Sequence, residues 1–289
     1  MMLSLPHSKD SRRSFLKKSL LASIGANFLP LPTFGQESDT SWGIILNTVQ
    51  DQMKAQPEAT LTALAEMGYT YIEGGVYGKS PTSYAKILSS LGLTAIGGGS
   101  SIANLIKNQD TFLRQAETLS QAFICCYWPW MSDATILQKK ECLEAAERLN
   151  TLGKSLKSHG VQLTWHNHDK EFVMIEGKTA FDWLMEYTDP AYVASQMDIY
   201  WVRKGGADPV ALMKKYAGRI KLLHIKDMDA SEEQDMTCPG DGIIDFQEVF
   251  NHATSAGVIY ATVENERNKA GLSCADTSIS YLKEIHWDS

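Results

Sequence analysis

An alternation of strand-like and helix-like segments is the feature that most constrains the fold of this chain. Eight apolar runs of strand length, rich in β-branched and aromatic residues, alternate with stretches of helical spacing. The runs are residues 42–49, 69–75, 93–99, 123–128, 162–168, 193–201, 220–227 and 258–266. Eight strand–helix units in about 250 residues match the repeat of a (β/α)8 barrel, the TIM barrel. We therefore expect an α/β barrel that forms a single domain.

Two of the intervening stretches show the helical pattern clearly. Residues 57–68 carry apolar side chains at helical spacing and end in Gly68, and residues 137–160 end in Gly160. An open doubly wound sheet is the alternative fold, but it usually has fewer strands. The glycine triplet at 97–99 lacks the spacing of a dinucleotide-binding fingerprint, so a nucleotide site has little support.

The first 35 residues differ from the rest of the chain. The basic segment SRRSFLKK, followed by a weakly apolar stretch, resembles a twin-arginine signal peptide. We expect residues 1–35 to direct export, for example to the periplasm, and residues 36–289 to form the barrel. An ordinary basic amphipathic N-terminus is the alternative. Gly25, Pro30 and Pro32 interrupt the short apolar stretch, so we expect no stable membrane insertion after cleavage, while an uncleaved anchor stays open.

Net charge argues against one class of partner. The whole chain has a net charge of −7, and 22 basic and 33 acidic residues remain after residue 35, a net charge of −11. Such a surface repels phosphate backbones unless a basic groove compensates, and we find no such groove in the sequence. We therefore expect no nucleic-acid partner, whereas a homo-oligomer is compatible with the sequence.

The five cysteines do not make a disulfide framework. Cys125 and Cys126 are adjacent on an expected strand and point to opposite faces, so they cannot pair without strain. Cys238 and Cys274 can pair after export, but the odd number of cysteines and the wide spacing leave this pairing open. We expect all five cysteines to be structural.

Four of the expected strands end in residues of the kind that bind metals. The fifth ends in His166 and His168, the sixth in Asp198, the seventh in His224 and the eighth in Glu264. Because the C-terminal strand ends of a (β/α)8 barrel meet at its mouth, these residues can converge. Two imidazoles and two carboxylates suit one divalent transition metal, Mn, Co or Zn, better than Mg or Ca.

Several segments resemble the sugar phosphate isomerase/epimerase family of the xylose isomerase-like TIM barrel superfamily. They are VASQMDIYWVRKGGADP, LLHIKDM, PGDGIIDF and ATVENE, and the likeness extends from near residue 41 to the C-terminus. In that family Glu, Asp, His and Glu hold one metal at the ends of the fifth to eighth strands. The resemblance assigns the last three positions to Asp198, His224 and Glu264. It assigns the first position to His166, where this chain departs from the family by having an imidazole instead of a carboxylate.

The two histidines of the fifth strand leave the choice of ligand open. Thr164, His166 and His168 share one face of the strand, whereas Trp165 and Asn167 share the other. Both imidazoles can therefore face the barrel mouth. We favour His166 as the metal ligand, and we expect His168 to act as an acid or base or to bind a substrate hydroxyl.

Further polar residues complete the expected catalytic set. Glu264 is the leading candidate for the catalytic base, followed by His168 and Glu73. Glu73 ends the second strand beside two glycines, and pairing with a neighbouring loop is its alternative role. Lys226 shares a strand face with His224, so it can stabilise the negative oxygen of an enediolate.

The segment after the seventh strand has features of a structural loop. We expect Asp227 to orient this loop. Residues 238–245 have the composition of a Gly-rich turn that leads into a helix capped by Asp245. The turn can shape a substrate lid, although a plain turn is the simpler interpretation.

Tryptophans near the strand ends favour a carbohydrate substrate. Trp128, Trp165 and Trp201 follow the fourth, fifth and sixth strands, where indole rings can stack on the C–H faces of sugars. We assign these three, together with Asn167, as substrate-binding residues. No arginine cluster suggests a phosphate clamp, so an unphosphorylated small carbohydrate is the better expectation.

The resemblance implies a metal-dependent sugar isomerase or epimerase that works through an enediolate. The alternative is a metal-dependent lyase or hydratase, a dehydratase, that acts on 3-keto-sugars or 3-keto-glycosides. The absent first glutamate argues against an epimerase with two opposed glutamates and leaves room for this alternative, but the isomerase or epimerase stays the first expectation. An endonuclease would need more metal ligands and a basic groove, and a non-catalytic sugar-binding barrel would have little use for four metal ligands.

Overall fold

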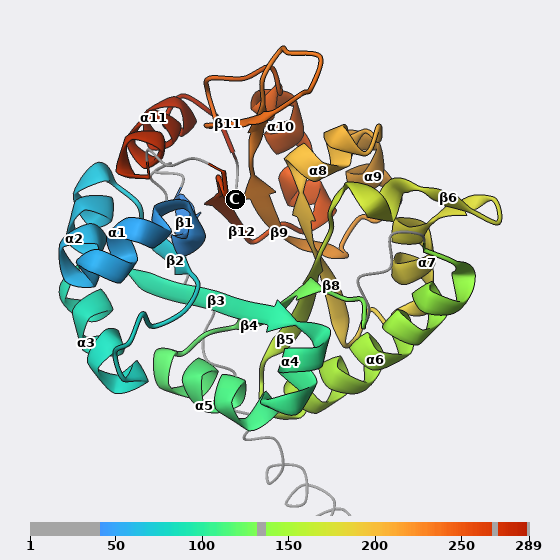
Figure 1. Cartoon of the computed structure of the whole chain (residues 1–289), viewed down its shortest axis with the longest axis horizontal. Helices are drawn as coiled ribbons and strands as arrows, with labels where there is room; N and C mark the ends of the chain where they lie inside the picture. The colour runs from blue at the N-terminus through green and yellow to red at the C-terminus, as the bar shows by residue number, and fades with distance from the viewer. Residues whose placement is uncertain (1–40, 132–136, 268–270, 288–289) are drawn as a thin grey trace, which may run out of the picture. The chain divides into compact units, whose positions relative to one another are not determined.

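Eight parallel strands close into a barrel in the computed structural model, which describes residues 41–131, 137–267 and 271–287 (Figure 1). The order around the barrel is β1-β12-β9-β8-β5-β4-β3-β2. The strands are β1 (Gly43–Ile45), β2 (Tyr71–Glu73), β3 (Thr94–Ser101), β4 (Phe123–Trp128), β5 (Gln162–His166), β8 (Val193–Asp198), β9 (Ile220–Ile225) and β12 (Tyr260–Val263). All eight expected strands are present, so the (β/α)8 prediction is confirmed. The expected signal peptide, residues 1–35, lies outside the described residues.

Helices surround the barrel, as Figure 1 shows. They are α1 (Gln50–Ala55), α2 (Pro57–Met67), α3 (Pro81–Ser90), α4 (Ile102–Lys107), α5 (Gln109–Leu119), α6 (Lys139–Ser158), α7 (Ala180–Tyr187), α8 (Ile199–Lys204), α9 (Pro209–Lys215), α10 (Phe246–Ala256) and α11 (Leu272–Leu282). Within the described ranges, no helix is both long enough and apolar enough to cross a membrane.

Local sequence signals set the ends of the expected helices. Pro57 occupies the first turn of α2, and Gly68 ends that helix in the left-handed conformation with φ of 106°. At the start of α6, Gln138 and Glu141 form a reciprocal capping box. Gly160 follows α6 with φ of 78°, so it makes the turn into β5 as expected.

The apolar core lies inside the barrel and between the strands and the helices. Ile44 of β1, Leu163 of β5 and Leu223 of β9 are fully buried. Burial of each such side chain stabilises the fold by about 1.5–3 kcal/mol. Trp165 of β5 is also fully buried and packs against Phe181 of α7, with ring centroids 5.0 Å apart. The outer face of the barrel wall is therefore held by contacts with the surrounding helices.

The glycine triplet belongs to β3 and not to a phosphate-binding loop. A Cβ atom on Gly99 would lie 1.8 Å from the carbonyl oxygen of Cys125 on β4, and one on Gly98 would lie 2.7 Å from the carbonyl oxygen of Gly74. Any larger residue would push β3 away from its neighbours. The triplet thus permits the close approach of backbones in this part of the barrel.

Short elements follow the strand ends. They are the 3-10 helices η1 (Leu46–Val49) and η2 (Asp169–Phe172), the hairpin of β6 (Met174–Ile175) and β7 (Lys178–Thr179), and the hairpin of β10 (Asp227–Met228) and β11 (Met236–Thr237). The carboxylate of Asp227 accepts hydrogen bonds from the backbone N–H groups of Gly240, Gly242 and Ile244, each at 3.1 Å. Asp245 then caps α10. The expected loop-orienting role of Asp227 and the expected cap are both confirmed.

One disulfide joins this loop to the last helix. Cys238 bonds to Cys274 of α11, whereas Cys125, Cys126 and Cys142 are free and buried. The pairing that the sequence left open is thus present. It closes a segment that includes the residues immediately after β12, where Glu264 lies.

Candidate metal centre

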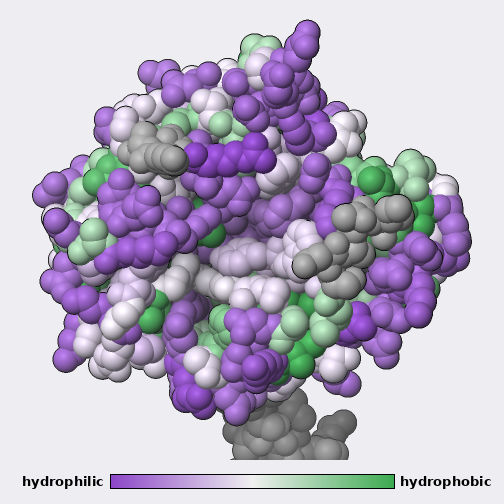
Figure 2. All heavy atoms as spheres, in the orientation of Figure 1, coloured by the Kyte–Doolittle hydropathy of each residue, from purple (hydrophilic) through white to green (hydrophobic). Residues whose placement is uncertain are grey.

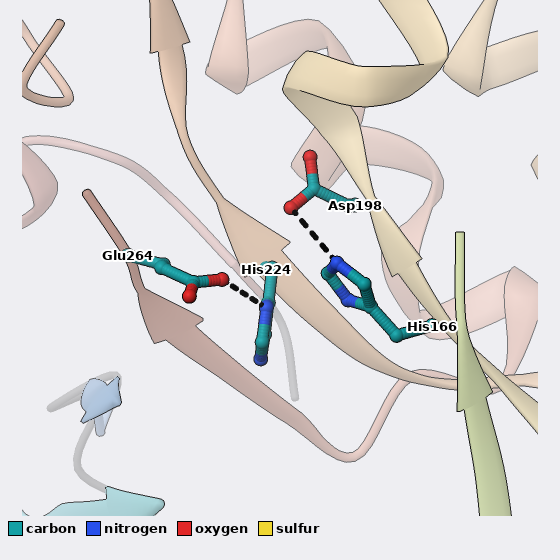
Figure 3. Close-up of side chains that lie close together, drawn as sticks. All are labelled: His166, Asp198, His224 and Glu264. Atoms are coloured by element: carbon teal, nitrogen blue, oxygen red, sulfur yellow. Dashed lines mark ion pairs between the residues drawn. The ribbon is translucent and has the colours of Figure 1, made fainter. Parts of the chain in front are cut away.

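Four side chains converge at the C-terminal ends of neighbouring strands. His166 ends β5, Asp198 ends β8, His224 lies in β9, and Glu264 follows β12. One ligand atom from each lies within 4.8 Å of the corresponding atom of every other, and all four residues are buried. Figure 3 shows the four side chains pointing toward one another. The sequence placed these four residues together, and the structure does so as well.

The strand register explains why they meet. Asp198 of β8 and Thr262 of β12 both pair with His224 of β9, and His166 of β5 pairs with Gln196, two residues before Asp198. Side chains two residues apart share a face of a strand. Glu264, two residues after Thr262, therefore points to the same side as His224.

Glu73 lies beneath the cluster and fixes the orientation of His224. Its Oε2 atom is 2.9 Å from Nε2 of His224, and it also accepts hydrogen bonds from Tyr127 at 2.7 Å, from Gln196 at 3.0 and 3.1 Å and from Thr262 at 3.0 Å. Only 1% of Glu73 is exposed. Both of its oxygens are thus engaged by neighbouring side chains, and its expected role as a catalytic base stays a prediction.

The second ring nitrogen of His224 faces the cluster. A proton on Nε2, donated to Glu73, leaves a lone pair on Nδ1. This Nδ1 atom lies 2.6 Å from Oε2 of Glu264. Two acceptors at that separation repel each other unless a proton or a metal cation offsets their partial negative charges.

Unsatisfied buried atoms support a metal. Oδ2 of Asp198, Nδ1 of His224 and Oε2 of Glu264 have no hydrogen bond of ordinary geometry. Buried polar atoms without partners are costly, and those that persist need an explanation. Here the atoms point toward one another and belong to residue types that bind metal. The cluster therefore fits a divalent metal site, with His166 as the fourth ligand.

Lys226 supplies the positive charge beside the cluster. Its ammonium group lies 2.9 Å from Oε2 of Glu264, 3.1 Å from Oδ2 of Asp198 and 3.4 Å from Oε1 of Glu266. Only 1% of Lys226 is exposed. Burial opposes its charge, but Asp198 and Glu264 outweigh this effect and raise the pKa of Lys226. Lys226 therefore stays protonated and can face a negative oxygen, as the sequence suggested.

The remaining pKa shifts follow from burial and from these neighbours. Burial raises the pKa of Asp198 to about 6, although Lys226 and His224 favour its carboxylate form. Burial also opposes the charge of Glu264, but Lys226 and His224 hold its pKa well below the usual range. Burial, with the nearby His224, lowers the pKa of His166 far below its ordinary value. His166 is thus neutral, which is the form that binds a metal.

His224 carries the opposite shift. Burial disfavours its charge, but the carboxylates of Glu73 and Glu264 on its two sides outweigh burial and raise its pKa to about 10. A positive charge is therefore stabilised at this point of the site. A bound divalent cation would supply that charge in place of the proton.

The second imidazole of the segment lies beside the cluster. The ring of His168 is 4.9 Å from that of His166, and it contacts the rings of Trp128 and Trp201 at 5.4 and 5.6 Å. Burial and the positive charge of Lys226 lower the pKa of His168 to about 4. His168 is therefore a neutral imidazole at the cavity, available for proton transfer or a hydrogen bond.

The expected substrate-binding residues fall into two groups. Trp128 and Trp201 contact the ring of His168, and stacking on a sugar stays a prediction for them. Trp165 points away from the mouth into the core, and a substrate-binding role for it is wrong. Asn167 is also fully buried, and its amide binds the backbone N–H and C=O of Asp198 at 3.0 and 3.3 Å. It holds the ends of β5 and β8 together and does not face a substrate.

A cavity of about 410 Å³ opens next to the cluster and falls within the usual size range of small-molecule sites. His166, His168, Lys226 and Glu264 form one side of it. Figure 2 shows a hollow near the centre of this face, with a pale to hydrophilic surface. The cavity thus brings the metal-binding side chains and the candidate catalytic groups to one space.

Sequence reasoning missed several residues of the site. Tyr127, Gln196 and Thr262 bind Glu73, Glu266 lines the cavity, and Glu171 accepts hydrogen bonds from His168 and Trp130 at 2.5 and 2.6 Å. Strand alternation offered a signal for some of them. Gln196 is two residues before Asp198, and Glu266 is two residues after Glu264.

The fold and this cluster define a (β/α)8 barrel with a candidate metal site. The chain belongs to the xylose isomerase-like TIM barrel family, whose sequence model matches residues 61–285. The predicted family resemblance is confirmed.

The names of individual relatives indicate different activities. Inosose dehydratase from Clostridium tetani is 32% identical in an alignment of 139 residues. The match covers 43% of this chain and 46% of that enzyme, so it spans about half of the curated relative. The crystal structure of a sugar phosphate isomerase/epimerase from Parabacteroides distasonis is 25% identical, with a TM-score of 0.71, over 87% of this chain and 97% of that chain. The IolI protein, solved with a zinc atom, is 16% identical with a TM-score of 0.67, over 85% of this chain and 96% of that chain, a likeness that shows the fold alone.

Proposed function

We propose that this protein is a metal-dependent dehydratase that removes water from a keto-sugar or a keto-cyclitol. The observation that carries the proposal is the set of four buried metal-binding side chains that converge beside one cavity, two of which line it. The similarity to inosose dehydratases supports a dehydratase over the isomerase or epimerase that the sequence first favoured.

Elimination of water needs a base, a stabilised negative oxygen and a leaving hydroxyl group. A divalent cation at the cluster, when bound, polarises a carbonyl oxygen and makes the neighbouring C–H bond more acidic. Glu264 is ionised and His168 is neutral, so either side chain can take that proton. The Lys226 ammonium can stabilise the developing negative oxygen. The side chain that took the C–H proton can then return it to the hydroxyl group on the next carbon, which leaves as water.

The departure at His166 favours elimination over epimerisation. A neutral imidazole that binds a metal through one nitrogen has no free lone pair on that nitrogen to take a proton. Of the two glutamates that an epimerase uses as metal ligands, this chain then has only the second, Glu264. An isomerase or epimerase remains the second candidate, supported by the Parabacteroides distasonis relative.

Incubation of the purified, zinc-supplied chain with inosose in D₂O separates the two candidates. A dehydratase gives a product that is lighter by one water, seen by mass spectrometry. An isomerase or epimerase gives a product of unchanged skeleton that has exchanged one hydrogen for deuterium, seen by NMR. Glu264→Gln serves as the control, because it keeps the shape of the side chain but removes its basic oxygen. Exchange without loss of water would reject the dehydratase.

The metal and the location are part of the same proposal. Two nitrogen and two oxygen ligands suit Zn, Mn or Co, and zinc is the first metal to test. The twin-arginine-like segment supports export. The Cys238–Cys274 disulfide agrees with it, because disulfides persist in oxidising compartments such as the periplasm. Detection of the mature chain in a periplasmic fraction would test this placement.

A further inference from the structure

The wall of the cavity opposite the metal cluster belongs to other elements. It is built from the β1 end and η1, from the loop after β2, from the end of β3 and from α5. The side chains there are polar but uncharged, or apolar: Asn47, Tyr77, Gln115, Ile45 and Phe112. A molecule that reaches the cluster must lie against this wall.

Charge is distributed unevenly around the cavity. Among its described lining residues, Lys226 is the one lysine, and none is an arginine. Its ammonium already contacts the carboxylates of Asp198, Glu264 and Glu266. One positive side chain thus faces three carboxylates. A divalent cation, when bound, would offset Asp198 and Glu264, which leaves Glu266 as the carboxylate with the least compensation. An anionic group on a ligand would find no uncommitted cation among these lining residues.

Glu266 places a carboxylate where it meets the ligand. It lines the cavity, its side chain is 33% exposed, and its contact with Lys226 is the longest of the three. Lys226 therefore offsets its charge only in part. A phosphate group in the cavity would lie near this carboxylate, and like charges brought together in a partly desolvated site repel strongly.

We infer that this wall is a subsite for an uncharged, hydroxylated part of the substrate, and that Glu266 determines specificity by rejecting phosphorylated ligands. The inference rests on the proposed function for the position of the reacting end. The amides of Asn47 and Gln115 can donate and accept hydrogen bonds, as sugar hydroxyls require. The hydroxyl of Tyr77 donates to the carbonyl oxygen of Leu46 at 3.1 Å, so it can accept a hydrogen bond from a ligand. Ile45 and Phe112 offer apolar contact to the C–H face of a ring.

Binding of a matched pair of probes tests the subsite without turnover. Isothermal titration of the zinc-supplied full chain would compare myo-inositol with myo-inositol 1-phosphate. We expect the wild type to bind the neutral probe at least about tenfold more tightly. Glu266→Gln should reduce the difference below about threefold by gaining affinity for the phosphate ester. Glu117→Gln, the same charge change at an exposed position of α5, should leave the ratio as in the wild type.

The outcomes separate this inference from the proposed function. Tighter binding of the phosphate ester to the wild type, or an unchanged ratio in Glu266→Gln, would overturn the role of Glu266. Absence of saturable myo-inositol binding would overturn the subsite. Failure to dehydrate inosose, with the expected binding ratio intact, would count against the proposed reaction and leave the subsite supported.

Discussion

Replacement of Glu73 with glutamine is expected to weaken zinc binding, although Glu73 is not one of the four ligands. Its Oε2 atom holds Nε2 of His224 at 2.9 Å and so directs the lone pair of Nδ1 toward the cluster. Gln196 donates to both oxygens of Glu73, at 3.0 and 3.1 Å. Either orientation of a glutamine amide would therefore place an N–H group against the N–H group of Gln196. The new amide would be badly matched and would not hold His224 in one tautomer.

The size of the effect follows from these contacts. Loss of a partner that orients a metal-bound histidine costs about 10–100-fold in metal affinity, or about 1.4–2.8 kcal/mol. The mismatched buried donors should also lower the free energy of unfolding by about 1–3 kcal/mol. We therefore expect Glu73→Gln to fold with a lower midpoint of thermal unfolding and to release zinc to a weaker chelator than the wild type does.

The assay is a zinc competition with a chelator of known affinity, at a temperature where both proteins are folded. Glu171→Gln is the matched control, because Glu171 is a fully buried glutamate that accepts two hydrogen bonds but does not contact His224. It should lose stability and keep its zinc affinity. A zinc affinity of Glu73→Gln within threefold of the wild type, or an equal loss in the control, would refute the reasoning.

Three other predictions concern the base, the disulfide and a buried acid. Glu264→Gln should abolish turnover of inosose while its circular dichroism spectrum stays native, and full activity would remove Glu264 from the mechanism. Replacement of both Cys238 and Cys274 with serine should lower the free energy of unfolding by about 4 kcal/mol, because the disulfide links residues 36 apart. A reducing agent should lower the unfolding midpoint of the wild type but not that of the double variant, and equal responses would contradict this. Burial raises the pKa of Glu171 from its ordinary value of 4.5 to about 7. The unfolded chain therefore loses this proton at lower pH than the native chain does. The contribution of Glu171 to the free energy of unfolding thus falls as pH rises from 4.5 to 7, by up to about 3 kcal/mol. The unfolding free energy of the wild type should thus fall relative to that of Glu171→Gln across this range, and a constant difference would disprove the assignment.

The sequence predicted the ligand set because two simple periodicities determine it. Strand alternation sets which side chains face the barrel interior, and the common direction of the strands brings their C-terminal ends to one mouth. These two rules are enough to predict that four side chains converge: His166, Asp198, His224 and Glu264. The same alternation placed Trp165 opposite His166, and the structure shows that this opposite face packs against α7.

The roles of Glu73 and Asn167 lay beyond the sequence because they depend on partners from distant strands. Glu73 is a carboxylate at a strand end, as a catalytic residue would be. Its hydrogen bonds with Tyr127, Gln196 and Thr262 depend on side chains that reach it from other strands of the barrel. Asn167 lies between two histidines, yet its amide binds the backbone of β8. The spacing of residues in the sequence does not predict such contacts.

Anomalous diffraction at the zinc edge, from crystals of the zinc-supplied chain, tests the central claim most directly. We predict a single strong peak within about 2.0–2.2 Å of one ligand atom each from His166, Asp198, His224 and Glu264. No peak at this cluster, or a peak bound by other side chains while these four point elsewhere, would contradict the metal site and the chemistry proposed from it.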